Sequence, residues 1–430
     1  MSRTAIVPVL AIVMLAGCAA AAPVSPAASV GSAAPLAKVS LALSPTATPS
    51  PTVAAATFSW QRLAAIPAEH DLYGMAASTR GYTVLEARRT IWFSPDGKSW
   101  TRTTLPFDTS TSNGSVLDAW ADAIVAGANG FVAVGGYDHT PCTSQQGDGG
   151  PPACARRPIS WASSDGLTWH SSLATAIPSD GSQLPAFSEF ARAWPAADGF
   201  DAAIEAHDSV RYHGNGLLHS RDGLVWTRLS AGPLADGTTA DSIYAHGGIG
   251  ATNGQRLLWQ SRDLGSFDPM TSLASSLDGL SWKPIAAFDG TGVSIALTLG
   301  PDAGASGPWL LVGDRSTPAS GATMAWFSED LVTWHSGPFR HGTASDPSVS
   351  GAARGAGGYV TVGSYRAEDG GSFPVTWRSA DGTTWMEVTS AEPEPVDGPT
   401  FLAAGPAGMI GLGTTGDPGA AVWIGVDGAP

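Results

Sequence analysis

Short runs in which apolar and polar residues alternate recur from about residue 57 to the end of the chain, and turn residues separate them. Alternation with a period of two is typical of β-strands that bury one face, and no segment sustains the apolar period of a helix. The clearest turns lie in near-copies of one motif, such as SPDGKSW, SSDGLTW and SADGTTW. Asp-Gly favours a tight hairpin because Gly adopts the positive φ that such turns require. We therefore predict hairpins over residues 92–100, 161–169, 218–226, 274–282, 326–334 and 377–385.

A second pair of apolar runs precedes most of these hairpins. AIVAGANGFVAVGG from Ala123, GAARGAGGYVTVGS from Gly351 and FLAAGPAGMIGLGT from Phe401 each contain two runs divided by Gly. Two inner and two outer strands make a four-stranded antiparallel sheet, and several such sheets around an axis make a β-propeller. Abundant Gly (53), Pro (32) and Trp (16), with only 14% charged residues, suit short strands joined by turns. The predicted fold class is all-β.

The number of blades follows from the tryptophans that close the hairpins. Trp100, Trp169, Trp226, Trp282, Trp334 and Trp385 follow one another at intervals of 51 to 69 residues, which fits propeller blades with their loops. The last unit, VWIGVDGAP, contains Trp423 and Asp427 but no closing strand, while FSWQRLA places Trp60 in the setting of the other closing tryptophans. We predict seven blades of four strands, with the N-terminal strand completing the C-terminal blade and removing a free sheet edge.

Blade four contains two matches to the motif. WQSRDLGSF, residues 259–267, fits the pattern as well as the hairpin over 274–282 does. Only 15 residues separate Phe267 from Trp282, too few for four further strands. We expect the match at Trp259 to be an insertion or an alternative hairpin inside blade four, and the pairing there, through Trp259 or through Ala274, stays open.

The N-terminus indicates the compartment. Arg3 precedes an apolar run from Ala5 to Leu15 that has the length of a signal-peptide core and is too short to span a bilayer. LAGC, ending at Cys18, resembles the lipobox of bacterial lipoproteins, in which the signal is removed before the Cys and the thiol carries a diacylglycerol. The alternative is an ordinary secretory signal with an incidental Cys. The resemblance implies an extracytoplasmic protein that is lipid-anchored to the cell membrane.

The segment after Cys18 is nearly all Ala, Pro, Ser, Thr and Val. Such a segment has no large apolar groups to bury and is expected to remain extended and disordered. The predicted organisation is therefore a lipoprotein signal peptide (1–17), a disordered tether (18–56) and a seven-bladed β-propeller (57–430).

Two further cysteines, Cys142 and Cys154, lie in the stretch YDHTPCTSQQGDGGPPACARRP. Outside the cytoplasm we expect them to form a disulfide, which by loop-closure entropy contributes about 3 kcal/mol. A metal site is the alternative, but two thiols with only His139 nearby are short of ligands. No metal is therefore predicted.

The net charge of −15, with no basic run, disfavours partners that are nucleic acids or anionic membrane surfaces. No Asp-x-Asp-x-Asp-Gly calcium loop is present to focus this charge. The acidic balance therefore indicates a charge that keeps a secreted protein soluble.

The repeated motif resembles the Asp-box, or BNR repeat, of sialidases, sortilin-like receptors and photosystem assembly factors, although Asp and Gly are adjacent here. The Asp of such a turn accepts hydrogen bonds from backbone N–H groups, and the Trp presents a large apolar face to the neighbouring blade. One identical motif per blade indicates a structural role. The residues with this role are Asp96, Trp100, Asp165, Trp169, Asp222, Trp226, Asp278, Trp282, Asp330, Trp334, Asp381, Trp385, Asp427 and Trp60. The resemblance implies that these turns lie opposite the ligand site.

Function is expected on the other face, in the loops that join strands two and three and the loops between blades. The candidate ligand residues are Arg88, Arg89, His207, Asp208, Arg211, Tyr212, His213, Arg315, Tyr365, Arg366 and Glu368. Glu69, His70 and Glu86 lie in the same group of loops. Several loop arginines are what a sialidase uses to hold a carboxylate, but the Phe/Tyr-Arg-Ile-Pro motif that opens sialidase domains is absent.

We therefore favour a surface-tethered, non-catalytic propeller that binds protein or glycan through this face. Two alternatives stay open, a sialidase-like glycoside hydrolase and an assembly-factor-like scaffold for a membrane complex. No cofactor is expected, and the chain is predicted to be a monomer.

Overall fold

A computed structural model of the chain divides it into two units, Met1–Val53 and Ala54–Pro430. The structure describes residues 58–87, 89–107, 118–138, 156–173, 188–207, 212–229, 245–250, 255–262, 270–278, 281–285, 293–300, 308–316, 321–340, 347–367, 371–388, 398–414 and 419–427. The predicted signal peptide, tether, lipidation site at Cys18 and disulfide between Cys142 and Cys154 all lie outside these residues.

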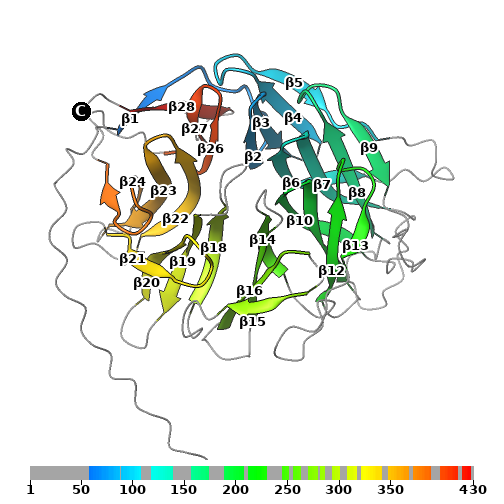
Figure 1. Cartoon of the computed structure of the whole chain (residues 1–430). Helices are drawn as coiled ribbons and strands as arrows, with labels where there is room; N and C mark the ends of the chain where they lie inside the picture. The colour runs from blue at the N-terminus through cyan, green and yellow to red at the C-terminus, as the bar shows by residue number, and fades with distance from the viewer. Residues whose placement is uncertain are drawn as a thin grey trace, which may run out of the picture. The chain divides into compact units, whose positions relative to one another are not determined.

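The second unit consists of seven antiparallel sheets of four strands, arranged in a ring (Figure 1). Blade one contains β2 (Leu72–Ser78), β3 (Gly81–Glu86), β4 (Thr90–Ser94) and β5 (Thr101–Thr104); blade two contains β6 (Ala119–Gly127), β7 (Gly130–Asp138), β8 (Arg156–Ser163) and β9 (His170–Leu173); blade three contains β10 (Ser188–Ala196), β11 (Gly199–His207), β12 (Tyr212–Ser220) and β13 (Thr227–Leu229); blade four contains β14 (Ala245–Gly250), β15 (Arg256–Arg262), β16 (Met270–Ser276) and β17 (Lys283–Ile285). Blade five contains β18 (Val293–Leu299), β19 (Trp309–Ser316), β20 (Gly321–Ser328) and β21 (His335–Pro338); blade six contains β22 (Ser348–Gly355), β23 (Gly358–Arg366), β24 (Ser372–Ser379) and β25 (Met386–Glu387); blade seven contains β26 (Phe401–Gly405), β27 (Gly408–Thr414), β28 (Ala420–Asp427) and β1 (Phe58–Arg62).

All of these elements are strands, so the prediction of an all-β, seven-bladed propeller is confirmed. Among the described residues, no helix has the length and apolar character that a membrane crossing requires.

The ring closes between the two ends of the propeller unit. β1 pairs antiparallel with β28, with Trp60 opposite Gly425. Beyond the strand, the Leu63 amide donates to the Val422 carbonyl. The N-terminal strand is thus the outer strand of the C-terminal blade, as predicted, and the ring has no unpaired edge at this point.

Blade four shows which of its two motif matches forms the outer hairpin. Ala274 on β16 pairs with Pro284 on β17, so the hairpin that closes at Trp282 is the outer one. Trp259 lies on β15 and pairs with Leu273. Its match therefore spans the hairpin between strands two and three of the same blade, and it neither inserts extra strands nor competes with the outer hairpin.

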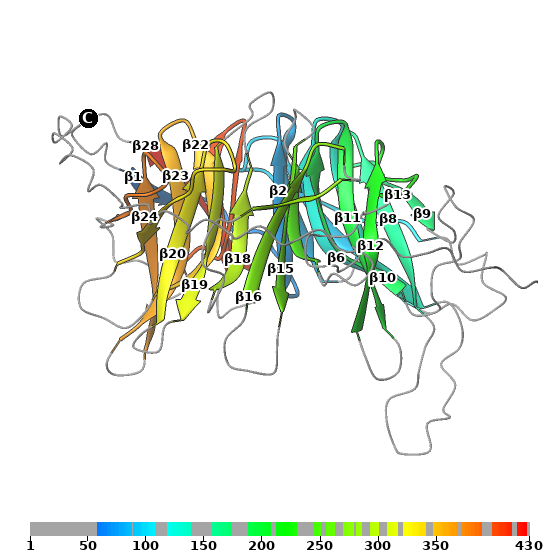
Figure 2. The same cartoon turned by 60° about the horizontal axis from the view of Figure 1, so that its bottom comes forward.

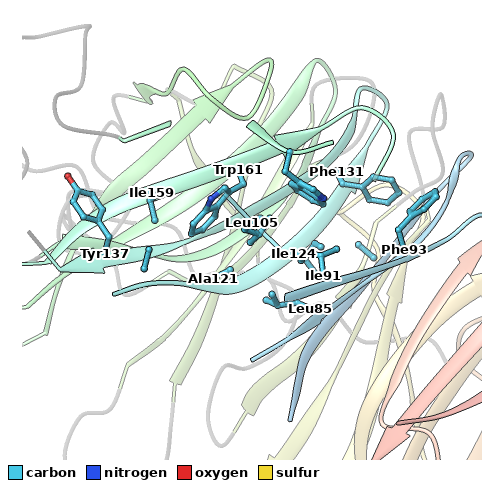
Figure 3. Packing of buried hydrophobic residues seen from close by; sticks show 14 residues of the cluster. Leu85, Ile91, Phe93, Leu105, Ala121, Ile124, Phe131, Tyr137, Ile159 and Trp161 are labelled. Carbon is cyan, nitrogen blue, oxygen red and sulfur yellow. The ribbon is translucent and has the colours of Figure 1, made fainter. Parts of the chain in front are cut away.

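The apolar core is divided among the interfaces between neighbouring blades. Leu85 and Ile91 of blade one share a cluster with Ala121, Phe131 and Trp161 of blade two, and all five are at most 3% exposed (Figure 3). The Trp161 indole N–H donates to a backbone carbonyl at 2.6 Å, so the polar atom of this ring is satisfied. Each large side chain buried in this way contributes about 1.5–3 kcal/mol, and every blade depends on its neighbours for this burial.

The antiparallel order gives the propeller two different faces. The turns between strands one and two and between strands three and four lie on one face, here named the turn face. The connections between strands two and three and from blade to blade lie on the opposite face, here named the loop face. Figure 2 shows the short turns, including the one between β22 and β23, along one edge of the ring.

Candidate functional site

The Asp-Gly motifs form the outer turns of the turn face. Asp165 Oδ1 accepts hydrogen bonds from the amides of Leu167 at 2.8 Å and Thr168 at 2.7 Å, and from the Ser163 hydroxyl at 3.0 Å. The Trp169 indole N–H donates to the Gly166 carbonyl at 3.1 Å. Burial opposes ionisation of this carboxylate, but the hydrogen bonds from the turn outweigh it and lower the pKa of Asp165 to about 2. Asp96, Asp222, Asp278, Asp330 and Asp381 each accept a hydrogen bond from the amide three residues on.

The residue after the Asp is held in the left-handed region and packs onto the preceding blade. Gly166 has φ 78° and a Cβ there would lie 2.2 Å from the Phe93 ring, while Gly382 has φ 76° and faces the Phe327 ring in the same way. In blade five this position is Leu331, with φ 62°. The motif therefore joins one blade to the previous one, which is a structural task.

Asp427 and Trp60 occupy a different setting from the other motif residues. Asp427 pairs with Phe58 in the ladder between β28 and β1, so it lies in a strand where the other motif aspartates lie in turns. The physical reason is that the two strands come from opposite ends of the unit and no turn joins them. The Trp60 indole N–H donates to the Thr376 hydroxyl of blade six at 3.0 Å.

The structure describes only part of the candidate ligand residues on the loop face. Arg88, Asp208, Arg211 and Glu368 lie outside the described residues. His207, Tyr212 and His213 are described by their backbone alone, which places His207 opposite Tyr212, and Ala206 opposite His213, at the end of the β11–β12 ladder. Arg315 and Arg366 lie near the loop-face ends of β19 and β23, opposite Ala322 and Ser372.

The described candidates come from four different blades: Arg89 from blade one, the backbone of His207 and Tyr212 from blade three, Arg315 from blade five, and Tyr365 with Arg366 from blade six. The Arg89 guanidinium lies 5.8 Å from the centre of the Phe107 ring, so it is held close to its own blade.

Glu86 has a structural role at the loop-face end of β3. It is fully buried, and its Oε1 accepts hydrogen bonds from the amides of Glu69 at 2.6 Å and His70 at 2.9 Å. Its Oε2 accepts the Trp92 indole N–H at 2.7 Å. Because all three contacts donate to the carboxylate, Glu86 fixes the segment that leads into blade one.

Among aromatic residues at the loop-face ends of the strands, Tyr212 and Tyr365 were sequence-based candidates, whereas Phe373 was not. Tyr365 and Phe373 of blade six stack with ring centres 5.7 Å apart and planes inclined by 24°. Phe373 is 42% exposed, and Tyr73, at the start of β2, is 53% exposed. The sequence carried a signal for Phe373, since it stands two residues before Val375, the apolar centre of its strand, and follows the loop Gly-Gly-Ser.

A cation also lies on an aromatic ring at this face. The Arg156 guanidinium is 5.3 Å from the centre of the Trp120 ring, and Arg156 Nη1 lies 3.1 Å from Oε1 of Glu189 in blade three. Cation–ring pairs therefore occur at the loop face in blades one and two.

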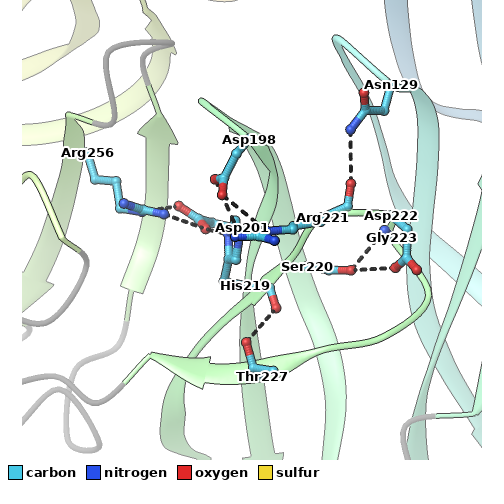
Figure 4. A network of polar contacts seen from close by, with 10 residues as sticks. All are labelled: Asn129, Asp198, Asp201, His219, Ser220, Arg221, Asp222, Gly223, Thr227 and Arg256. Atoms are coloured by element: carbon cyan, nitrogen blue, oxygen red, sulfur yellow. Dashed lines mark hydrogen bonds and ion pairs between the residues drawn. The ribbon is translucent and has the colours of Figure 1, made fainter.

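A charged network replaces apolar packing on the turn face between blades three and four (Figure 4). Asp201, 1% exposed, accepts from Arg256 Nε at 2.6 Å, and its other oxygen lies 2.8 Å from His219 Nδ1. His219 Nε2 is 3.4 Å from Asp198, which also lies 3.5 Å from Arg221. Arg256 comes from β15 and Asp201 from β11, so the network links two blades.

Comparisons with known proteins give no family. No family model matches the chain, and no curated protein matches it. Among solved structures, it is similar to a Trypanosoma rangeli sialidase in complex with 2,3-difluorosialic acid, with 13% identity over 86% of this chain and 59% of that chain and a TM-score of 0.40. It is also similar to an ancestral GH74 enzyme (13% identity, 84% of this chain and 48% of that chain, TM-score 0.46), and to a Mycobacterium tuberculosis puromycin-hydrolyzing peptidase (13%, 86% and 54%, TM-score 0.44). The chain thus spans between 48% and 59% of the length of these three proteins.

Proposed function

We propose that this protein is a non-catalytic β-propeller that binds a glycan through its loop face and is held at the cell surface by a lipid on Cys18. The observation that carries the proposal is the stacked pair of blade six, in which Tyr365 is half-buried and Phe373 is exposed. Stacked rings that reach the surface offer a flat apolar contact area for a ligand. A flat ring offers its apolar face to the C–H face of a sugar, and costs little conformational entropy to order.

The second element of the proposal is the pairing of cations with rings. Arg156 on Trp120 and Arg89 on Phe107 present guanidinium edges beside aromatic faces. Such edges donate to sugar hydroxyls or carboxylates, while the ring supports the sugar plane. This combination of flat apolar faces with fixed donors suits a carbohydrate better than an extended protein surface, which needs a larger continuous apolar area.

The test is a screen of the full chain on an array of neutral and acidic oligosaccharides, followed by titration of the strongest ligand. Phe373→Ala should weaken binding by about tenfold or more, as expected for an aromatic anchor. Val332→Ala is the matched control, because Val332 is an apolar residue that is 79% exposed on the turn face, and its removal should leave the affinity unchanged. Equal affinity of the two variants would contradict the assignment to the loop face.

The same ligand decides between binding and hydrolysis. The ligand should be recovered intact after long incubation, and fluorogenic glycosides should release no fluorophore above the rate without protein. Release of a sugar would replace the binding function by the sialidase-like hydrolase alternative. Capture of a membrane protein complex in the absence of any glycan binding would instead favour the scaffold alternative.

The anchor is tested separately. Cys18→Ser should move the protein from the membrane fraction to the soluble extracytoplasmic fraction and abolish incorporation of labelled fatty acid. Unchanged fractionation would show that the protein is held by something other than a lipid on this residue.

A further inference from the structure

The turn face has one position at which the repeated turn is missing. In blade one, Gly97 of the Asp-Gly turn packs onto Ile410 of blade seven, and in blades two and six the corresponding glycines pack onto Phe93 and Phe327 of the preceding blades. In blade seven, β28 is the third strand and β1 is the fourth, and they come from opposite ends of the unit. The chain therefore makes no turn between β28 and β1 at the junction with blade six.

A cavity of about 490 Å³ lies at this position, here named the seam cavity. Its walls include Val360 of blade six. Val360 stands two residues after a glycine with positive φ, which is the position that Ile410 holds in blade seven. Phe58, Met409, Arg354 and Arg378 complete the side-chain lining, and glycines of the β22–β23 and β26–β27 turns contribute backbone. The seam cavity thus occupies the place where other blades hold their Asp-Gly turn.

Arg378 stands where the flanking blades five and seven have Phe327 and Ile424, whereas blades three and four have His219 and Ser275 there. It directly precedes the motif serine, as Phe93 and Phe327 do in blades one and five, where those rings support the next turn. The Arg378 guanidinium lies 5.8 Å from the centre of the Phe58 ring, and its Nη2 donates to the Gly357 carbonyl at 3.2 Å. A cation therefore stands at the position where blades one and five place a ring under the next turn.

Arg354 is a second cation in the wall of the seam cavity. It pairs with Tyr359, and the residues in the same register are Ala77 in blade one and Ala126 in blade two. Its guanidinium lies 5.6 Å from the centre of the Tyr359 ring. Two arginines thus line one cavity in a chain whose net charge is −15. Guanidinium groups are planar forks that match a carboxylate, so the cavity favours an acidic ligand.

We propose that the seam cavity binds an aspartate-bearing tight turn of a partner protein. The shape argument is that this position holds such a turn in the other blades, and the charge argument is that two arginines line the cavity. The partner's turn would pack its glycine Cα against Val360 and Phe58 and place its carboxylate at Arg354 and Arg378. The proposal is independent of glycan binding, because the seam cavity lies on the turn face and the aromatic pair on the loop face.

The test uses the full chain and a cyclic peptide of the sequence Ser-Ala-Asp-Gly-Thr-Thr-Trp, copied from residues 379–385 of this protein. Saturable binding is expected, and replacing the peptide's aspartate by alanine should weaken it by about tenfold or more. Arg378→Gln and Arg354→Gln should each cause a loss of similar size. Arg378→Lys, which keeps the charge and loses the fork, should bind with intermediate affinity.

Arg80→Gln is the matched control. Arg80 is an exposed arginine on the same face that donates to the Ser164 carbonyl at 2.6 Å, far from the seam cavity in the ring. This variant should bind the peptide as the unaltered chain does. Urea midpoints within experimental error for all variants establish that lost binding reflects the cavity and not unfolding.

Three results would overturn the proposal. The first is no saturable binding up to about 1 mM peptide. The second is equal binding of the aspartate and alanine peptides, or of the Arg378→Gln and Arg80→Gln variants. The third is binding that occurs only after deletion of residues 428–430, which would assign the seam cavity to the chain's own last residues.

Discussion

Replacing Arg256 with methionine removes the cation that lies against Asp201 across the junction of blades three and four. Asp201 is 1% exposed, and Arg256 is 8% exposed. Removing one partner of a buried ion pair leaves a buried charge without compensation, which costs about 3–5 kcal/mol. His219 Nδ1 stays 2.8 Å from the Asp201 carboxylate and retains one contact. We therefore expect the lower end of this range, a loss of about 3 kcal/mol for Arg256→Met.

The assay is urea unfolding at neutral pH, followed by tryptophan fluorescence. The double variant Asp201→Val/Arg256→Phe copies the apolar pair that Val132 and Phe200 form between blades two and three. It should unfold within about 1 kcal/mol of the original chain, because a buried ion pair and a well-packed apolar pair differ little in net stability. If the double variant regains stability, the loss in Arg256→Met comes from the unpaired carboxylate and not from lost packing.

Arg221→Ala is the control for this experiment. Arg221 is 82% exposed and lies 3.5 Å from Asp198, so its ion pair is solvated. Exposed pairs contribute little, and a change within about 0.5 kcal/mol is expected. The reasoning is refuted if Arg256→Met costs less than about 1 kcal/mol, or if the double variant is no more stable than the single one.

Three further predictions concern the turns and the buried carboxylate. The pKa of Asp165 is lowered to about 2 in the folded chain, so its stabilisation is complete above about pH 4 and is lost as the pH falls toward 2; Asp165→Asn should flatten the acid limb of the stability curve, and a parallel curve would contradict this. Leu331→Gly relieves a positive φ of 62° worth about 1 kcal/mol but loses a buried side chain worth about 2–3 kcal/mol, so thermal unfolding should show a net loss, and a gain would show that backbone strain dominates. Glu86→Gln replaces one of the two carboxylate oxygens, which together accept three hydrogen bonds, by an NH2 group that only donates. We expect a loss of about 1–3 kcal/mol in the free energy of unfolding by urea and an altered Trp92 fluorescence. An unchanged urea midpoint would mean that water satisfies this contact.

The sequence predicted the parts of the fold that depend on local chemistry. An Asp-Gly turn between alternating runs specifies a hairpin wherever it occurs, so the outer hairpins over residues 92–100 and 161–169 could be placed from a few residues each. The period of the motif counted the blades. Trp60 and Trp423, in matching contexts at the two ends, indicated that the ring closes through the N-terminal strand, which the β1–β28 ladder confirms.

Contacts between blades could not be predicted from the sequence, because they depend on which residues face each other across two sheets. Asp201 and Arg256 are 55 positions apart and on different blades, and neither stands in the repeated motif. Glu86 was placed among the loop-face residues because it stands next to a predicted loop, and its burial and its contact with the Glu69 amide show a structural role. Tertiary packing overrides local pattern at such positions, so a single chain does not reveal them.

Equivalent positions in the repeated blades distinguish the two arginine clusters of the turn face, Arg256 with Asp201 and Arg354 with Arg378. Neighbouring blades show what the fold requires there: an apolar residue where Asp201 stands, and a small one where Arg354 stands. A departure at one interface is therefore a change that the propeller does not need for closure. At the junction of blades three and four, Arg256 is matched by the Asp201 carboxylate within the chain, so the departure is internally compensated. At the seam, Arg354 and Arg378 stand in the wall of a cavity beside an apolar ring, where the remaining blades place an aspartate-bearing turn. The binding proposal for the seam therefore rests on the shape of the cavity and on the two guanidinium groups in its wall.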